Sequence, residues 1–228
     1  MPILQCSDLI KTYFQGDTPI NAINRAFIKV MRGEFISIIG QSGSGKSTLL
    51  HILSGLDRPG AGKVYIDGKD IFAMNDREFS KFRNKNLGFI FQSFNLLPTL
   101  TAKENILMPQ LIAGQTPSKQ YFDELVEMLG IADRIHHLPS ELSGGQQQRV
   151  AVARALINKP KIVFADEPTG NLDAKSAEEL VSLLLKSREL YNQTLIMVTH
   201  DSNLAAKADR VMRMTNGILE PITKEQIF

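Results

Sequence analysis

A segment rich in glycine and serine, followed by a lysine, is the part of this sequence best suited to bind phosphate. Residues 40–47 read Gly-Gln-Ser-Gly-Ser-Gly-Lys-Ser and fit the phosphate-loop pattern G-x-x-x-x-G-K-[ST]. Glycines let the backbone turn successive N–H groups toward one anion. Lys46 is expected to reach the β- and γ-phosphates of a nucleoside triphosphate, and the Ser47 hydroxyl to bind Mg²⁺. The predicted nucleotide contacts are Gly40, Gln41, Ser42, Gly43, Ser44, Gly45, Lys46, Ser47 and Thr48.

The segments on either side of this loop are those that such a site needs. The apolar run 35–39 predicts a buried strand that leads into the loop, and residues 48–53 predict a helix that leaves it. The start of a helix adds a partial positive charge, which favours a bound anion. A glycine-rich turn that binds nothing is the alternative, and the strand and helix around the loop argue against it.

A second acidic site is expected because a phosphate loop binds its nucleotide together with a metal ion. The apolar run 162–165 predicts a central strand of a parallel sheet, and it ends in Asp166 and Glu167. Ligands bind at the carboxyl ends of such strands. We therefore expect Asp166 to hold Mg²⁺ and Glu167 to act as general base toward the attacking water. Two surface acids at a strand end are the alternative.

Gln92 and His200 also follow predicted strands. The Gln92 carbonyl could bind Mg²⁺ or the attacking water, although a single Gln is weak support. A lone His is more often a structural residue, but at a strand end the His200 imidazole could bond to the γ-phosphate. The predicted catalytic residues are Lys46, Gln92, Glu167 and His200.

A second glycine motif lies far from the phosphate loop. Ser143 precedes Gly144 and Gly145, at the start of a helix predicted over 145–158. A serine hydroxyl, bare N–H groups and a helix dipole form another anion site. An ordinary helix cap explains Ser143 but not the paired glycines. One chain therefore carries two phosphate-binding devices on separate elements.

The composition describes a globular chain without a general affinity for nucleic acid. Of 228 residues, 43% are hydrophobic, and 26 basic residues nearly balance 24 acidic ones. The single cysteine, Cys6, cannot form an intrachain disulfide, and no apolar stretch approaches the roughly 20 residues that a membrane span needs. The N-terminus lacks a signal-like segment, so we expect a soluble, cytosolic chain.

Hydrophobic periodicity predicts a β-rich start, a helical region over 101–158 and alternating strands and helices around it. The predicted strands are 4–9, 26–30, 35–39, 63–66, 87–91, 162–165, 194–198, 211–214 and 218–220. The predicted helices are 48–53, 76–85, 102–113, 118–129, 145–158 and 174–190. Turn pairs at 67–68 and 216–217 predict hairpins.

Taken together, these motifs resemble the ATP-binding-cassette (ABC) ATPases, and the resemblance covers essentially the whole chain. The motifs that follow the family's order and spacing are the phosphate loop, Gln92, 142–146, 162–167, 171–173 and His200. The resemblance implies an α/β fold, with a P-loop NTPase (RecA-like) parallel-sheet core, an antiparallel β subdomain and an inserted α-helical subdomain. The core and β subdomain would span about 1–92 and 159–228 of a single domain, and the helical subdomain about 93–158.

The resemblance also implies roles for residues whose own patterns say little. Tyr13 matches the aromatic that stacks on adenine, and ATP and Mg²⁺ are the implied cofactors. Two copies would form a homodimer around two ATP molecules, and Asp173 would lie at the dimer seam. The residues that would face the other copy's phosphate loop are Leu142, Ser143, Gly144, Gly145 and Gln146.

The implied partner is an integral membrane permease subunit, which would hold this cytoplasmic chain on the inner face of the cell membrane. The segments 55–59, 101–105 and 167–173 resemble the lipoprotein-release, macrolide-export and antimicrobial-peptide-resistance type, whose permeases often have few spans and a large extracellular domain. A non-transport ABC ATPase that regulates a membrane protein in cell division or cell-wall remodelling is the alternative, since its motifs would be the same.

Two further classes are not expected. A nucleic-acid partner is disfavoured because the chain lacks the long coiled coil of the DNA-repair members and the second cassette of the translation members. A protein kinase is excluded because the glycine loop is of the G-K-S type and the H-R-D motif is missing.

The loop 94–98 is unusually apolar and has two possible interpretations. It forms either a small satellite of the hydrophobic core or a surface that receives a partner. The family resemblance favours the second, with this loop and the helical insert forming a groove for a short helix of the membrane subunit.

Overall fold

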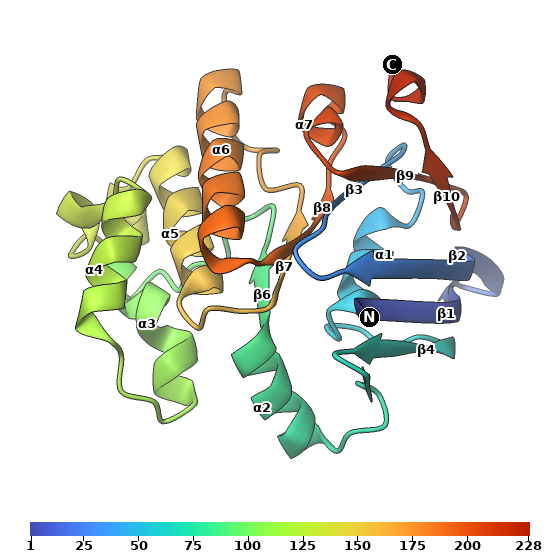
Figure 1. The fold of residues 1–228 in the computed structure, drawn as a ribbon, viewed down its shortest axis with the longest axis horizontal. Helices are drawn as coiled ribbons and strands as arrows, with labels where there is room; N and C mark the ends of the chain where they lie inside the picture. The colour runs from blue at the N-terminus through green and yellow to red at the C-terminus, as the bar shows by residue number, and fades with distance from the viewer. The chain divides into compact units, whose positions relative to one another are not determined.

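The computed structural model describes all residues, 1–228, and divides them into two compact units. Unit 1 contains residues 1–80 and 194–228, and unit 2 contains residues 81–193. In Figure 1 the blue and red ends of the chain therefore belong to the same unit. Unit 2 is an insertion between two segments that fold together.

Unit 1 contains an antiparallel sheet with the order β2-β1-β4-β5. Its strands are β1 (Pro2–Gln15), β2 (Thr18–Met31), β4 (Ala61–Ile66) and β5 (Lys69–Asp70). β1 and β2 are much longer than the short strands predicted for this region. Bulges interrupt their pairing, with Asp8 at φ 51° and Arg25 at φ 52°, so the alternation of apolar residues breaks while the strands continue.

The other strands of unit 1 are β3 (Phe35–Ile39), β8 (Thr194–Val198), β9 (Arg210–Thr215) and β10 (Ile218–Ile222). β3 pairs in parallel with both β8 and β9, and β10 folds back on β9 as an antiparallel hairpin. Every residue of β3 and β8 is buried, as strands covered on both faces should be. α1 (Lys46–Leu53) packs against β8, and α7 (Ser202–Ala206) packs against β3.

Unit 2 is built around two parallel strands, β6 (Leu87–Ile90) and β7 (Ile162–Asp166). Only helices and turns lie between them in sequence. The helices of this unit are α3 (Ala102–Ile112), α4 (Lys119–Met128), α5 (Gly144–Leu156) and α6 (Ala174–Tyr191). α5 packs against both α3 and β6, and Figure 1 shows α3 beside α5. α2 (Asp76–Asn86) leads from unit 1 into unit 2.

These elements confirm the predicted α/β class, and apart from β1 and β2 their bounds agree with the predicted ones within a few residues. The short strand β5, the helix α7 and short 3₁₀ turns over 132–134, 139–141 and 224–226 have no predicted counterpart. Separation of about 93–158 as a helical subdomain stays a prediction. None of the helices has the length and apolar character needed to cross a bilayer.

Candidate functional site

The phosphate loop connects the buried strand β3 to the helix α1 in unit 1. Gly40, Gly43 and Gly45 adopt φ values of 153°, 76° and 104°. The residue before the helix is Gly45, and no side chain caps the first N–H groups of α1. These donors therefore stay available to an anion, which is the property that phosphate binding requires.

The glycines of the loop are needed for different reasons. A Cβ atom at Gly40 would lie 2.2 Å from the carbonyl oxygen of Met214, and one at Gly45 would lie 2.0 Å from that of Ala22. Neither backbone can yield easily, since Met214 lies in β9 and Ala22 in β2. Gly43 has open space around it, so only its positive φ favours glycine.

Lys46 is held inside the loop by the backbone. Its Nζ atom donates to the carbonyl oxygens of Gly40 at 3.0 Å and Gln41 at 2.9 Å. The side chain is buried, and so is the Ser44 hydroxyl, which has no hydrogen-bond partner. An ammonium group bound only to neutral oxygens lies where an anion would gain most from it, because partial burial strengthens the attraction.

A cavity of about 510 Å³ opens beside the loop, a volume within the range of small-molecule sites. Residues 40–44 form one part of its wall, and His200, Ser202, Arg213 and Asn216 contribute to the rest. The structure thus brings His200 to the same cavity as the phosphate loop, although the two are far apart in sequence. Arg213 adds a positive charge, which favours an anionic ligand.

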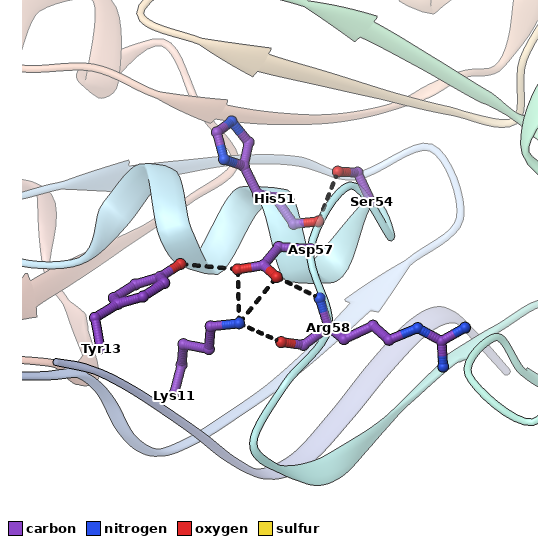
Figure 2. A network of polar contacts seen from close by, with 6 residues as sticks. All are labelled: Lys11, Tyr13, His51, Ser54, Asp57 and Arg58. Atoms are coloured by element: carbon purple, nitrogen blue, oxygen red, sulfur yellow. Dashed lines mark hydrogen bonds and ion pairs between the residues drawn. The ribbon is translucent and has the colours of Figure 1, made fainter.

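Tyr13 belongs to a polar network beside α1 that also contains Lys11, Asp57 and Arg58 (Figure 2). Its hydroxyl donates to Asp57 Oδ2 at 2.8 Å, while 42% of the residue stays exposed. Lys11 pairs with the same carboxylate at 2.8 Å. Burial raises the pKa of the Tyr13 hydroxyl, and the Asp57 carboxylate adds to this, while Thr48 acts in the opposite direction. Burial disfavours the charged form of Asp57, but hydrogen bonds from Lys11 and Tyr13 lower its pKa overall.

Unit 2 carries the two predicted acids at the end of β7. Asp166 is the last residue of this strand and only 9% exposed, and Glu167 follows with φ 42°. A positive φ is unusual for a glutamate and is often found where a side chain is held for function. The next residues turn back, since the Gly170 N–H donates to the Glu167 carbonyl at 3.0 Å.

Gln92 lies beside this turn. β6 pairs with β7 through Ile90 and Ala165, so both strands end at the same edge. A Cβ atom at Gly170 would lie 2.9 Å from the Gln92 side-chain nitrogen. The Asn171 side chain donates to the Gln92 carbonyl at 2.9 Å. The structure of unit 2 thus brings Gln92 and Glu167 together.

A buried amide joins the two segments that carry these residues. Gln148 in α5 is fully buried, and its Nε2 donates to the Pro168 carbonyl at 2.7 Å and to the Phe91 carbonyl at 3.4 Å. Each acceptor is a sequence neighbour of a predicted catalytic residue. The signal that could have identified Gln148 is its helical spacing with the buried Val152 and Ala155.

The second glycine motif begins α5. The Ser143 hydroxyl accepts from the Gln146 N–H at 3.3 Å, and the Gln146 side chain accepts from the Ser143 N–H at 2.9 Å. This capping box explains Ser143 within a single chain. A Cβ atom added at Gly144 or Gly145 would lie 3.7 Å or more from the nearest surrounding atoms of the chain, which is ordinary van der Waals contact. Internal packing therefore does not require these glycines, which favours an external ligand.

Asp173 and the loop 94–98 have clear local roles. Asp173 caps α6 through Ser176, whose hydrogen bonds lower the pKa of the carboxyl group. Arg154 donates to the Phe94 carbonyl at 2.7 Å and thus braces the start of the loop. No residue of this loop is fully buried, and Leu97 is 44% exposed. The exposure favours the surface interpretation over a satellite of the core.

The residues expected to hold Mg²⁺ fit that ion by their chemistry. Ser47, Asp166 and Gln92 offer hydroxyl, carboxylate and amide oxygens, the donors that Mg²⁺ prefers. The chain has no group of three or more His, Cys, Asp or Glu gathered to hold a metal. Mg²⁺ that binds with a nucleotide needs only one or two protein ligands, because phosphate and water supply the rest.

Comparison with known proteins gives consistent matches. The sequence profile of the ABC transporter family matches residues 23–170. An uncharacterized ABC transporter ATP-binding protein of Thermotoga maritima is 46% identical, over 99% of this chain and 97% of its own. The lipoprotein-releasing system ATP-binding protein LolD of Cytophaga hutchinsonii is 49% identical, over 95% and 98%. A solved ATP-binding cassette, a dimer in a post-hydrolysis state bound to ADP and Pi, is 40% identical over 97% and 98%, with a TM-score of 0.88.

Proposed function

Because this chain belongs to the ABC transporter family, we propose that it binds and hydrolyses ATP to drive a membrane complex that releases lipoproteins. Family membership confirms the resemblance drawn from the motifs. It also confirms the P-loop NTPase fold, since the related cassette superimposes over nearly the whole chain. Members of this family hydrolyse ATP, and the roles that follow assign that reaction to residues of this chain.

The phosphates of ATP bind at the start of α1. Lys46 neutralises the β- and γ-phosphates, and the uncapped N–H groups of the helix supply further donors. Ser47 in unit 1 and Asp166 in unit 2 would each offer an oxygen ligand to Mg²⁺, which would supply positive charge to the phosphate oxygens. The half-exposed ring of Tyr13 stacks on adenine. The burial of Lys46 and the cavity lined by residues 40–44 are the features that support this assignment.

The attacking water is prepared by groups at the strand ends. Glu167 acts as general base toward this water. Gln92 orients the water or a metal ligand through its side-chain oxygen, and its position beside the Glu167 turn supports the pairing of these two roles. His200 bonds to the γ-phosphate from the wall of the cavity.

Two copies of the chain bind ATP between them. The segment 142–146 of one copy faces the phosphate loop of the other, and Asp173 lies at the seam. Two observations support this arrangement: Gly144 and Gly145 have room that their own chain does not use, and the related cassette is a dimer. Since the γ-phosphate bridges the copies, its hydrolysis weakens the dimer and provides a switch.

A permease partner couples this switch to transport. The exposed apolar loop 94–98 is the proposed contact for that subunit, which has few membrane spans and a large extracellular domain. The chain would then sit at the inner face of the membrane. The observation that carries lipoprotein release, rather than the cell-division alternative, is the 49% identity with a lipoprotein-releasing system protein over 95% of the chain.

Reconstitution with a candidate permease subunit tests the proposal. Vesicles that contain both subunits and a labelled lipoprotein should release the label when ATP and Mg²⁺ are added. Glu167→Gln is the matched control, since it keeps the nucleotide contacts but lacks the base, so it should bind ATP and release nothing. If ATP is hydrolysed but the labelled lipoprotein is not released, the proposed ATPase activity stands and the proposed role in lipoprotein release is contradicted.

A further inference from the structure

We propose that Asp57 is a positioning residue for the nucleotide base, because it holds the Tyr13 ring at a fixed place relative to the phosphate loop. The inference rests on the proposed function, in which Tyr13 contacts adenine. No motif assigns a role to Asp57. The basis for this role is the polar network of Figure 2, in which the Asp57 carboxylate accepts hydrogen bonds from both Tyr13 and Lys11.

Tyr13 lies in a part of the antiparallel sheet that contains only two strands. β1 pairs with β4 only as far as Ile10, which lies opposite Ala61. Beyond that point β1 pairs with β2 alone, and Tyr13 lies opposite Ile20 in this extension. A two-stranded ribbon is only marginally stable by itself. The ribbon is held near its base, where the Ala22 carbonyl lies against Gly45, and the Tyr13 hydroxyl also contacts the Thr48 side chain in α1. Asp57 is therefore one of two polar anchors of a ring that lies beyond the last strand pairing with β4.

Asp57 supplies a connection to the phosphate loop. The backbone N–H groups of Leu56 and Asp57 donate to the His51 carbonyl at 2.8 and 3.2 Å, which attaches this segment to the last turn of α1. The same helix begins at Lys46, directly after the glycines. The Asp57 carboxylate accepts from the Tyr13 hydroxyl at 2.8 Å, so a short series of bonds joins the ring to the phosphate loop.

Lys11 stabilises the charged form of the Asp57 carboxylate and fixes its orientation toward Tyr13. Its Nζ atom donates to Asp57 Oδ1 at 2.9 Å and to the Arg58 carbonyl at 2.7 Å. The Lys11 side chain is 15% exposed, and Nζ lies 5.1 Å from the centre of the Tyr13 ring. The Arg58 N–H also donates to the carboxylate, at 2.7 Å. With these bonds satisfied, the carboxylate has one favoured position for the Tyr13 hydroxyl.

A ring that is already in place binds the base with a smaller loss of conformational freedom. Removal of the Asp57 carboxylate should therefore weaken binding of the adenosine part of a nucleotide and leave phosphate binding unchanged. We expect a loss of about fivefold to tenfold in affinity. ADP and pyrophosphate separate the two parts, because they share a diphosphate and differ by the adenosine, and neither is a substrate for ATP hydrolysis.

The experiment measures the dissociation constants of ADP and pyrophosphate by titration calorimetry for the wild type, Tyr13→Ala and Asp57→Ala. Both variants should lose affinity for ADP and keep affinity for pyrophosphate. Tyr13→Phe removes the hydroxyl from both Asp57 and Thr48, so it should lose at least as much ADP affinity as Asp57→Ala. The double variant Tyr13→Phe with Asp57→Ala should bind ADP no more weakly than Tyr13→Phe alone. Asp76→Ala is the matched control, since Asp76 is 98% exposed and contacts only the outer end of Arg58, at 3.6 Å.

Each outcome separates this inference from the proposed function. If Tyr13→Ala weakens ADP alone and Asp57→Ala weakens nothing, the positioning role is wrong and the adenine contact stands. If Tyr13→Ala also changes nothing, the adenine contact of the proposed function fails and the inference falls with it. Equal loss of ADP and pyrophosphate in Asp57→Ala would show general damage to the site and overturn the inference.

Discussion

Gln148→Met tests whether the buried amide of α5 keeps the catalytic segments in register. The substitution preserves the length of the side chain and removes its N–H donors. The Pro168 and Phe91 carbonyls then lose the bonds of 2.7 and 3.4 Å that Gln148 donates. Because these carbonyls adjoin Glu167 and Gln92, the loss should affect both stability and hydrolysis.

The expected loss of stability follows from the burial of the groups involved. Gln148 and Pro168 are both buried, and a buried acceptor that loses its partner costs about 1–3 kcal/mol. Part of this is offset, since the Gln148 Oε1 atom is itself buried without a partner and disappears in the variant. We expect a net loss of about 1–2 kcal/mol, which lowers the melting temperature of a chain of this size by roughly 2–8 °C.

Hydrolysis should fall further than stability alone explains. A displacement of a catalytic group by about 1 Å can cost about a hundredfold in rate, so turnover per bound ATP should fall by about tenfold or more. The assay compares phosphate release with the number of nucleotides bound, measured below the melting temperature. ADP affinity should stay within about twofold, because the phosphate loop belongs to unit 1.

Gln110→Met is the matched control for this measurement. Gln110 is also buried, donates from Nε2 to the Ile157 carbonyl at 3.1 Å, and has an unpartnered Oε1. Its acceptor does not adjoin a predicted catalytic residue. Both variants should lose similar stability, and only Gln148→Met should lose turnover. Equal turnover in the two variants would refute the positioning of the catalytic segments by Gln148.

Three further predictions concern other parts of the chain. Lys46→Ala should reduce ATP hydrolysis by about a hundredfold or more, because the phosphates lose their cationic partner; near-normal phosphate release would contradict this. Leu96→Ser with Leu97→Ser should weaken copurification with the permease and leave ADP affinity unchanged; a parallel loss of both would indicate a core role. Burial raises the pKa of the Cys6 thiol to about 12, so the folded state binds a proton that the unfolded state releases above about pH 8.5. The free energy of unfolding should therefore fall by up to about 1.4 kcal/mol per pH unit above that value, and Cys6→Ala should abolish this slope in denaturant titrations.

Much of the fold and part of the site could be predicted from the sequence. The phosphate loop is contiguous, so its spacing alone indicates its chemistry, and α1 begins at its lysine. Most helices and strands were also predictable, because each carries its own periodicity. β1 and β2 were not, since bulges at Asp8 and Arg25 shift the pattern of apolar residues within a continuous strand.

The contacts of the predicted site residues were decided by tertiary structure. Gly40 and Gly45 are required because the carbonyls of Met214 and Ala22, distant in sequence, approach them closely. His200 shares a cavity with the phosphate loop because β3 and β8 pair in parallel, with Ile38 opposite Val198. Such contacts depend on the register between strands, and no local pattern of residue types specifies that register.

Residues to which no motif assigned a role illustrate the same limit. A polar residue such as Asp57 or Gln148 acquires its role from the partner that folding brings to it, so composition and spacing do not distinguish it from an ordinary surface or helical residue. The sequence by itself determined the family, the elements and the chemistry of the contiguous loop. Only the tertiary structure decided which distant backbone and side-chain groups hold that chemistry in place, because hydrogen bonds of about 3 Å depend on the packing of the folded chain.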